Sequence, residues 1–356
     1  MIEDIFGAAV APEEARLVMI PVPWEATTSY GRGTARGPEA MALASVQVDL
    51  FDLELEALGV PEPHRAGLAM LPIDAAVRER ADEASRLALE VIEAYEEHAG
   101  AEHAGAEHAG DEPPRPEVAR ALARVNELSR WLDGWLGATV EHWLARGKLV
   151  GVVGGDHSVP FASIAAHVRR HPELGLLHFD AHADLRVAYQ GFVGSHASIM
   201  HRVVTETPLA RLVSVGVRDF CREEHAAAEA SRGRIVPFYD ARIQRELMSG
   251  RCFDDVARAI VEALPREVYV SFDIDGLEPG LCPHTGTPVP GGLTFRQATR
   301  ILEAVVESGR SIVGFDLVEV APGPDGDEWD ANVGARLLYK LLGYTLAGVA
   351  SQRLVT

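Results

Sequence analysis

The feature that most constrains the fold of this chain is the alternation of short, apolar, β-branched runs with longer segments of helical periodicity. Eight such runs occur, at 17–20, 68–71, 149–153, 174–180, 212–217, 235–238, 268–273 and 312–317. Segments with apolar residues at three- and four-residue spacing lie between them, at 74–97, 117–146, 254–264, 295–307 and 331–346. This alternation predicts an α/β fold with a sheet of about eight mainly parallel strands and helices on both faces.

Length and composition favour one large domain. The chain has 356 residues, and α/β folds often run well beyond the ~150 residues of an average domain. Hydrophobic residues make up 47% and charged residues 24%, which is typical of a globular protein and excludes disorder over most of the chain. We therefore expect residues 1–356 to form a single domain, with one low-complexity insertion at about 97–116.

This insertion repeats the sequence Ala-Glu-His-Ala-Gly. A five-residue step advances about 140° around a helix, so His98, His103 and His108 cannot share one helical face. The glycine in each repeat weakens a helix further. We expect a flexible loop between two helices, and the alternative is loose binding of a transition metal by the three histidines.

The charge of the chain limits its partners. The 33 Lys and Arg against 53 Asp and Glu leave a formal net charge of −20, which disfavours nucleic acid and favours a small cationic ligand. No apolar run approaches the ~18 residues of a membrane helix, and the N-terminus lacks a basic stretch before an apolar run. The three cysteines form no CxxC pair, as is typical of a reducing compartment. We therefore expect a cytoplasmic protein without a membrane partner.

Three clusters of acidic and imidazole side chains follow three of the predicted strands. They are Gly-Gly-Asp-His-Ser at 154–158, His-Phe-Asp-Ala-His-Ala-Asp at 178–184 and Ser-Phe-Asp-Ile-Asp at 271–275. In parallel sheets the ligand site lies beyond the carboxyl ends of the strands, which is where all three clusters fall. The two glycines of the first cluster permit a sharp turn that brings His157 to this edge. Asp156 is expected to support the ligands or the turn rather than to bind a metal ion itself.

The second and third clusters are the stronger metal signals. Asp180, His182 and Asp184 alternate, which predicts that they project from one side of an extended chain. Asp273 and Asp275 lie at the end of an otherwise buried strand, where unpaired carboxylates are costly and a cation is expected. Taken singly, each cluster also has a structural interpretation: a carboxylate that caps a helix, or a core histidine bonded to the backbone.

Together the clusters supply four carboxylates and two imidazoles, which suffice for two divalent ions if some carboxylates bridge. Two such ions would balance the charge of the four aspartates and lower the pKa of a bridging water, so that hydroxide forms near neutral pH. Oxygen-rich ligation without thiolates favours Mn²⁺ over a structural zinc site. The implied chemistry is hydrolysis.

The three clusters, in this order, resemble the metal-ligand motifs of the ureohydrolases, the arginase and agmatinase family. His-Thr-Gly-Thr-Pro at 284–288, Gly-Phe-Asp-Leu-Val-Glu-Val-Ala-Pro at 314–322 and the segment 21–38 are further similarities. The resemblance extends from about residue 17 to residue 346, except for the insertion. It implies a three-layer arginase-like fold, hydrolysis of a guanidino compound, and a homo-oligomer of three or six chains.

The resemblance also implies roles for individual residues. Two Mn²⁺ ions per chain are expected, with Ni²⁺ or another divalent ion as the alternative, and Asp180 and Asp273 would bridge them. The ligands would be His157, Asp180, Asp184 and Asp273 for one ion, and His182, Asp180, Asp273 and Asp275 for the other. His196 matches the histidine that passes a proton to the leaving amine, and Glu319 matches the carboxylate that pairs with the guanidinium.

The substrate is expected to be agmatine, hydrolysed to putrescine and urea. Arginases usually carry an asparagine immediately after the second motif, where this chain has Leu185 and Arg186, so arginase itself is disfavoured. The alternatives are a guanidino-acid hydrolase, such as a guanidinobutyrase, or a formiminoglutamase, in which Arg186 would pair with a substrate carboxylate. A metal-bound scaffold without catalysis is disfavoured, because all six ligand positions, His196 and Glu319 are present.

Overall fold

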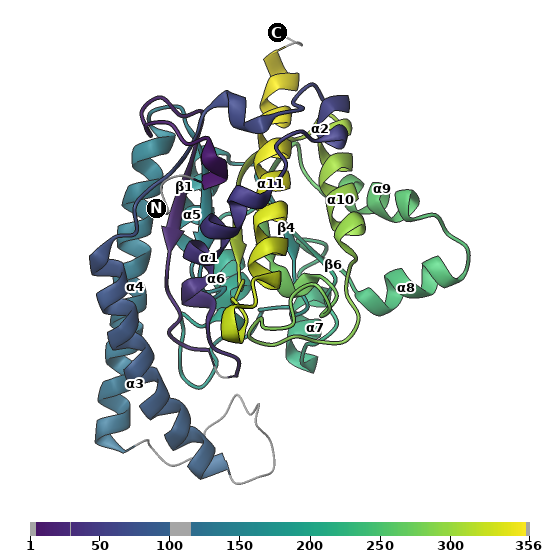
Figure 1. Cartoon of the computed structure of the whole chain (residues 1–356). Helices are drawn as coiled ribbons and strands as arrows, with labels where there is room; N and C mark the ends of the chain where they lie inside the picture. The colour runs from purple at the N-terminus through teal and green to yellow at the C-terminus, as the bar shows by residue number, and fades with distance from the viewer. Residues whose placement is uncertain (1–4, 29, 100–114, 354–356) are drawn as a thin grey trace.

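The computed structural model describes residues 5–28, 30–99 and 115–353, and one parallel sheet organises them (Figure 1). Its strand order is β2-β1-β3-β8-β7-β4-β5-β6, and every neighbouring pair is parallel. The strands are β1 Leu17–Val22, β2 Leu68–Met70, β3 Leu149–Gly154, β4 Gly175–Phe179, β5 Arg211–Val215, β6 Ile235–Phe238, β7 Glu267–Asp273 and β8 Ser311–Val318. The eight predicted strands are confirmed.

Helices cover both faces of the sheet, as predicted. They are α1 Gly37–Ala44, α2 Leu53–Ala57, α3 Ala75–Ala99, α4 Pro116–Leu144, α5 Phe161–Arg170, α6 Ile199–Glu206, α7 Arg222–Ala230, α8 Asp240–Met248, α9 Phe253–Ala263, α10 Phe295–Glu307 and α11 Trp329–Arg353. Successive residues of a strand point to opposite faces, so Leu177 and Phe179 of β4 pack with α9, α10 and α11, whereas Leu176 packs with α6 and α7. The three layers are therefore helix, sheet and helix.

The long helices α3 and α4 run side by side at one edge of the molecule and reach beyond the sheet (Figure 1). The histidine-rich insertion joins them. Its residues 100–114 and the side chain of His98 lie outside the described residues, so the loop prediction and its metal-binding alternative stay predictions.

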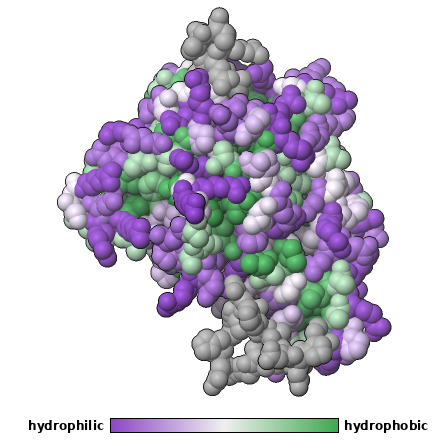
Figure 2. Space-filling model, turned by 180° about the vertical axis from the view of Figure 1, so that it is seen from behind, coloured by the Kyte–Doolittle hydropathy of each residue, from purple (hydrophilic) through white to green (hydrophobic). Residues whose placement is uncertain are grey.

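On the face seen in Figure 2, the surface is mainly hydrophilic, with smaller groups of apolar side chains between the polar ones. Within the described residues, no helix is long and apolar enough to cross a membrane. The strands of the sheet interior are, in contrast, almost entirely buried, and every residue of β8 lies in the core. Such continuous burial is typical of a central parallel strand with helices on both sides.

Candidate active site

The side chains predicted as metal ligands meet at the carboxyl edge of four strands that are neighbours in the sheet, β3, β8, β7 and β4. His157 follows β3, Asp180, His182 and Asp184 follow β4, Asp273 ends β7, and Asp275 lies in the short 3₁₀ helix η7, Ile274–Gly276. Glu319 follows β8. Parallel strands end at the same edge, so motifs that are far apart in the sequence come together there.

The first group of side chains surrounds His157. Its Nδ1 lies 2.9 Å from Asp180 Oδ2, 3.1 Å from Asp184 Oδ2 and 3.3 Å from Asp273 Oδ2. All four side chains are buried. Burial opposes a charge on the imidazole, but the hydrogen bonds to Asp180, Asp184 and Asp273 outweigh it and raise the pKa of His157 well above its usual value.

The second group surrounds His182. Its Nδ1 lies 3.1 Å from Asp275 Oδ2 and 3.4 Å from Asp180 Oδ1. Asp180 therefore faces His157 with one carboxylate oxygen and His182 with the other, which is the geometry expected of a bridging ligand. Asp273 contacts His157 and also accepts a hydrogen bond from the backbone N–H of Asp275, at 2.8 Å from Oδ1.

The prediction that Asp180, His182 and Asp184 project from one side of an extended chain is wrong. Strand β4 ends at Phe179, and the chain then turns, with the backbone N–H of His182 donating to Asp180 Oδ1 at 2.6 Å. Asp184 adopts a left-handed conformation with φ of 53°. The turn sends Asp184 toward His157 and His182 toward Asp275, so these residues reach the site because the chain folds back on itself.

The four aspartates crowd negative charge into a buried space. Burial, together with Asp275 and Asp180, raises the pKa of Asp273 well above its usual value, and burial with Asp180 raises the pKa of Asp184 to about 7. Among the described residues, only histidines form ion pairs with these aspartates. Carboxylate oxygens and imidazole nitrogens are the donors that divalent transition ions prefer, so the residues present fit the expected metal ions.

Three supporting side chains were not predicted from the sequence. His178 Nε2 lies 2.8 Å from Asp180 Oδ2, and His157 Nε2 lies 3.0 Å from Ser271 Oγ. The Ser271 hydroxyl in turn donates to Asp316 Oδ1 at 3.0 Å. A signal existed, because His178 and Ser271 each precede a predicted ligand by two residues, which is the period that places side chains on one face of a strand.

Glu319 is fixed beside the first group. Its Oε1 accepts a hydrogen bond from the backbone N–H of His157 at 2.8 Å, and its backbone has a positive φ of 62°. Burial, followed by Asp273 and Asp156, raises the pKa of Glu319 well above its usual value. Oε2 is also buried and has no hydrogen-bond partner among the described residues. One oxygen is therefore held by the protein, and the other remains for a ligand.

His196 begins the 3₁₀ helix η6, His196–Ser198, which Ser195 caps by accepting from the backbone N–H of Ala197 at 3.3 Å. The imidazole Nδ1 is buried and has no hydrogen-bond partner in the described part of the chain. Burial, followed by the positive charges of His182 and His157, lowers the pKa of His196 to about 4. The side chain is therefore neutral at neutral pH.

The other two residues discussed from the sequence lie nearby. Asp156 is a turn residue, as expected: Oδ2 accepts from the backbone N–H of Ala26 and Oδ1 from that of Ser158, both at 3.0 Å. Arg186 follows the second motif and lies over the ring of Tyr189, with its guanidinium carbon 5.6 Å from the ring centroid. The predicted contact of Arg186 with the substrate stays a prediction.

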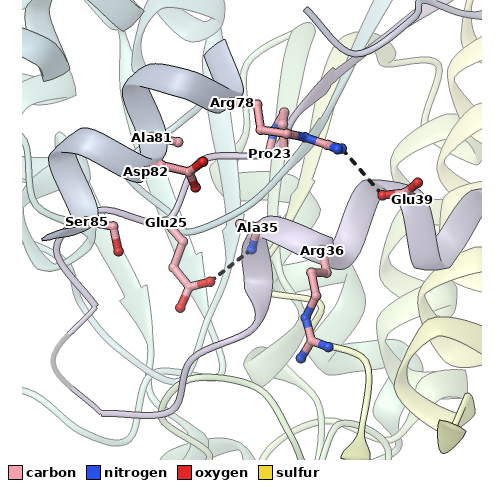
Figure 3. Close-up of a pocket in the computed structure, with 9 residues that line it drawn as sticks. All are labelled: Pro23, Glu25, Ala35, Arg36, Glu39, Arg78, Ala81, Asp82 and Ser85. Carbon is pink, nitrogen blue, oxygen red and sulfur yellow. Dashed lines mark hydrogen bonds and ion pairs between the residues drawn. The ribbon is translucent and has the colours of Figure 1, made fainter. Parts of the chain in front are cut away.

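A hollow of about 330 Å³ lies between α3 and the segment that follows β1 (Figure 3). It is lined by Pro23, Glu25, Ala35, Arg36, Glu39, Arg78, Ala81, Asp82 and Ser85. Glu25 accepts hydrogen bonds from the backbone of Gly33 and Ala35, and burial raises its pKa. Arg78 pairs with Glu39 at 3.4 Å. The lining therefore holds three carboxylates and two guanidinium groups.

Comparison with known proteins identifies the family of this chain. The sequence model of the arginase family matches residues 15–343. The chain belongs to the arginase family. It is 36% identical over 341 residues to an N(1)-aminopropylagmatine ureohydrolase of Thermus thermophilus, an alignment that covers 95% of this chain and 94% of that relative. It is 32% identical over 207 residues to an agmatinase of Bacillus subtilis, covering 57% of this chain and 66% of the relative.

Solved structures of the arginase family share the fold. The agmatine ureohydrolase of Thermoplasma volcanium superposes with a TM-score of 0.71 at 22% identity, and the match covers 98% of this chain and 96% of that one. The predicted family, fold and enzyme class are therefore confirmed: this arginase-family protein is a ureohydrolase, an enzyme that acts on guanidino compounds.

Proposed function

We propose that this chain hydrolyses the guanidino group of an agmatine-type amine to urea and the free amine, with two divalent metal ions held between His157 and His182. The observation that carries this proposal is the carboxylate of Asp180, whose Oδ2 faces His157 at 2.9 Å and whose Oδ1 faces His182 at 3.4 Å. The oxygen-rich donor set favours Mn²⁺. When bound, two such ions supply a hydroxide nucleophile near neutral pH.

The ligands in this proposal follow the two groups described above. One ion would be held by His157, Asp180, Asp184 and Asp273, and the other by His182, Asp180, Asp273 and Asp275. Asp180 and Asp273 would bridge them. The positive charge of the ions would offset both the burial and the repulsion that raise the pKa values of Asp184 and Asp273 in the crowded site.

Glu319 is the proposed partner of the guanidinium group. Its Oε1 is occupied by the backbone N–H of His157, which fixes the plane of the carboxylate, and its Oε2 is free to accept from a guanidinium N–H. A charge-assisted hydrogen bond in a buried site is stronger than one in water. Glu319 would therefore orient the guanidinium carbon toward the nucleophile.

His196 is the proposed proton donor to the leaving amine. Its neutral imidazole would take up, at the unpartnered Nδ1, the proton that the attacking water loses as its oxygen bonds to the guanidinium carbon. With a pKa lowered to about 4, the resulting imidazolium would give that proton to the leaving nitrogen readily. The leaving amine of a guanidine needs a proton before or during cleavage of its carbon–nitrogen bond. Proton uptake and release at His196 meet this need.

For the substrate we propose N(1)-aminopropylagmatine first and agmatine second. The Thermus relative that aligns over nearly its whole length carries this substrate in its name, whereas the Bacillus agmatinase aligns over 57% of the chain. A longer substrate carries an additional ammonium group. The net charge of −20 favours such a cationic tail.

A urea-release assay with Mn²⁺ tests the proposal. The panel is N(1)-aminopropylagmatine, agmatine, arginine, guanidinobutyrate and guanidinopropionate, with ammonia and formamide measured for formiminoglutamate. We expect the highest kcat/KM for aminopropylagmatine and the next for agmatine. Fastest release from guanidinobutyrate would move the enzyme to the guanidino-acid hydrolases, and formamide without urea would identify a formiminoglutamase.

From the family resemblance we further propose a homo-oligomer of three or six chains. Light scattering coupled to size-exclusion chromatography measures the mass of the assembly directly, and a monomeric mass would overturn this part of the proposal.

A further inference from the structure

The segment that carries His196 lies against the helical pair α3 and α4. We call residues 185–198, between the second motif and α6, the shuttle loop. The loop begins at the site and returns to it, and its middle part packs on the helices. Because loops are normally the most mobile parts of a protein, this packing needs an explanation.

The middle of the shuttle loop is a tight turn. The backbone N–H of Phe192 donates to the carbonyl of Tyr189 at 2.8 Å, and the N–H of Tyr189 donates to the carbonyl of Phe192 at 3.2 Å. Gln190 and Gly191 between them have positive φ values of 50° and 81°, as in the type I′ turn of a β-hairpin. The side chain of Phe192 is completely buried among apolar residues of α3 and α4, such as Val91.

The side chain of Asn126 on α4 forms hydrogen bonds to the backbone of this turn. The Asn126 amide Nδ2 donates to the carbonyl of Gly191 at 3.3 Å, and its Oδ1 accepts from the N–H of Val193 at 3.2 Å. One side chain therefore satisfies the backbone on both sides of the buried Phe192. A Cβ at Gly191 would lie 2.7 Å from Leu122 Cδ2, so the turn is seated directly on the helix.

The contact continues along one face of α4. Leu122, Asn126, Ser129 and Asp133 follow one another at spacings of four, three and four residues, which places them on one face of the helix. Ser129 lies under Gly194, where a Cβ would come within 2.9 Å of the serine Cβ. Asp133 pairs with Arg202 of α6 at 2.7 Å. The face therefore contacts the chain both before and after His196.

A direct contact joins the turn to His196. The ring of Tyr189, the first residue of the turn, meets the imidazole of His196 edge to face, with ring centroids 6.1 Å apart. Any movement of the turn away from α4 would carry Tyr189 with it and remove this support. Proton transfer requires that the donor stay within hydrogen-bond reach of the reacting atom, so a displaced imidazole loses rate.

We infer that Asn126, through the turn that it holds, is a positioning residue that keeps His196 in place for proton transfer. This inference rests on the proposed role of His196. It assigns a function to α4 that neither the metal ligands nor Glu319 require: the helix supports the proton-transfer side of the site. Leu122, Ser129 and Asp133 contribute to the same face, but Asn126 alone bonds to the backbone of the turn on both sides of Phe192 within the described residues.

The test compares Asn126→Ala with Asn332→Ala, the same change on α11, where the Asn332 side chain bonds only to Arg336 within the described residues. The loss of two hydrogen bonds corresponds to roughly a tenfold change in the equilibrium between the held and the displaced turn. We therefore expect Asn126→Ala to lower kcat about tenfold with little change in KM. Asn332→Ala should keep the wild-type kcat. Added imidazole should restore part of the kcat of Asn126→Ala, as it should for His196→Ala. Free imidazole can carry the proton in place of a His196 side chain that is displaced in the first variant and absent in the second.

The outcomes separate the inference from the function on which it rests. Unchanged kcat in Asn126→Ala, with a large loss in His196→Ala, overturns the positioning role of Asn126. Unchanged kcat in His196→Ala overturns the proposed proton transfer itself. A loss in Asn126→Ala that imidazole does not relieve also contradicts the inference. If Asn126→Ala loses metal or unfolds, Asn126→Asp decides, because it keeps the acceptor for Val193 and replaces the donor to Gly191 with a charged acceptor. A lowered kcat in folded, metal-loaded Asn126→Asp supports the inference, and an unchanged kcat overturns it.

Discussion

Two fully buried histidines, ten residues apart in the sequence, have opposite electrostatic surroundings. His157 lies at the edge of the sheet among three aspartates, and its pKa is raised well above the usual value. His167 lies on α5, over Gly314 of β8 and 4.9 Å from the ring of Tyr269, and burial lowers its pKa to about 4. Its Nδ1–H donates to the carbonyl of Ser163 at 2.8 Å.

The difference between these two histidines shows that the interior of the sheet serves stability, whereas the strand ends serve function. In the helix-covered interior, burial excludes charge, and a histidine is kept neutral like the apolar residues around it. At the strand ends the carboxylates of Asp180, Asp184, Asp273 and Asp275 are buried together at a cost to the folded chain. Such a region is favourable only with compensating positive charge, so we expect it to depend on metal ions, whereas the interior does not.

The largest expected effect comes from removing a bridging carboxylate. Asp180→Ala or Asp273→Ala should halve or empty the metal site and lower urea release by roughly a thousandfold or more, since metal catalysis contributes several kcal/mol. The metal-free Asp273→Ala protein should also be at least as stable as the metal-free wild type, because one crowded charge is gone. Elemental analysis and calorimetry measure both quantities. A variant that keeps two ions per chain and full activity would remove the residue from the bridge.

Glu319→Gln probes charge at the edge of the same region. We expect the metal ions to stay bound and kcat/KM to fall about ten- to a hundredfold, which corresponds to the ~1.5–3 kcal/mol of a hydrogen bond to a charged group. The amide keeps the shape of the side chain and removes its negative charge. Steady-state kinetics with a parallel metal count provide the measurement, and unchanged kinetics would exclude Glu319 from the substrate site.

The interior histidine should make stability depend on pH with a defined sign. His167 has a pKa of about 4 in the folded chain, against about 6.5 in an unfolded one, so the unfolded state binds the extra proton between these values. Its contribution is fully present above pH 6.5 and is lost as the pH falls toward 4, up to about 3 kcal/mol. Denaturant unfolding of wild type and His167→Phe across this range should show a flatter slope for the variant. Parallel slopes would disprove the assignment.

The smallest effect is expected at Arg186. We favour an arrangement in which this side chain points away from an ammonium tail, so Arg186→Met should change kcat/KM for agmatine by less than about threefold, within ~0.5 kcal/mol. Guanidinobutyrate serves as the second substrate, and thermal stability reports on a structural role. Selective loss of guanidinobutyrate hydrolysis in a folded variant would instead indicate that Arg186 holds a substrate carboxylate.

The sequence predicts the sheet of this chain well, because each strand depends mainly on its own apolar, β-branched residues. It also predicts which side chains meet at the edge, since the clusters follow the strands directly. The order of the strands depends on packing between distant segments, and no local pattern contains it. The strand β3, for instance, lies between β1 and β8, although β8 is more than 150 residues further along the chain.

Details of the site that depend on unusual backbone conformations were not predictable. The left-handed conformation of Asp184 turns the second motif back on itself. The presence of an aspartate at that position does not by itself predict a positive φ. The contact between the backbone N–H of Gly31 and the carbonyl of Gly286, at 3.0 Å, joins two loops that no motif connects. Contacts of this kind depend on packing between distant loops, which no local sequence pattern contains.

A crystal structure of the Mn²⁺-loaded enzyme, with anomalous diffraction recorded at the manganese absorption edge, tests the central claim most directly. We predict two manganese peaks per chain, one next to His157 and one next to His182, with the carboxylate of Asp180 between them. A single peak, no peak at this edge of the sheet, or manganese bound only by the histidine-rich insertion would contradict the assignment of a two-metal hydrolase.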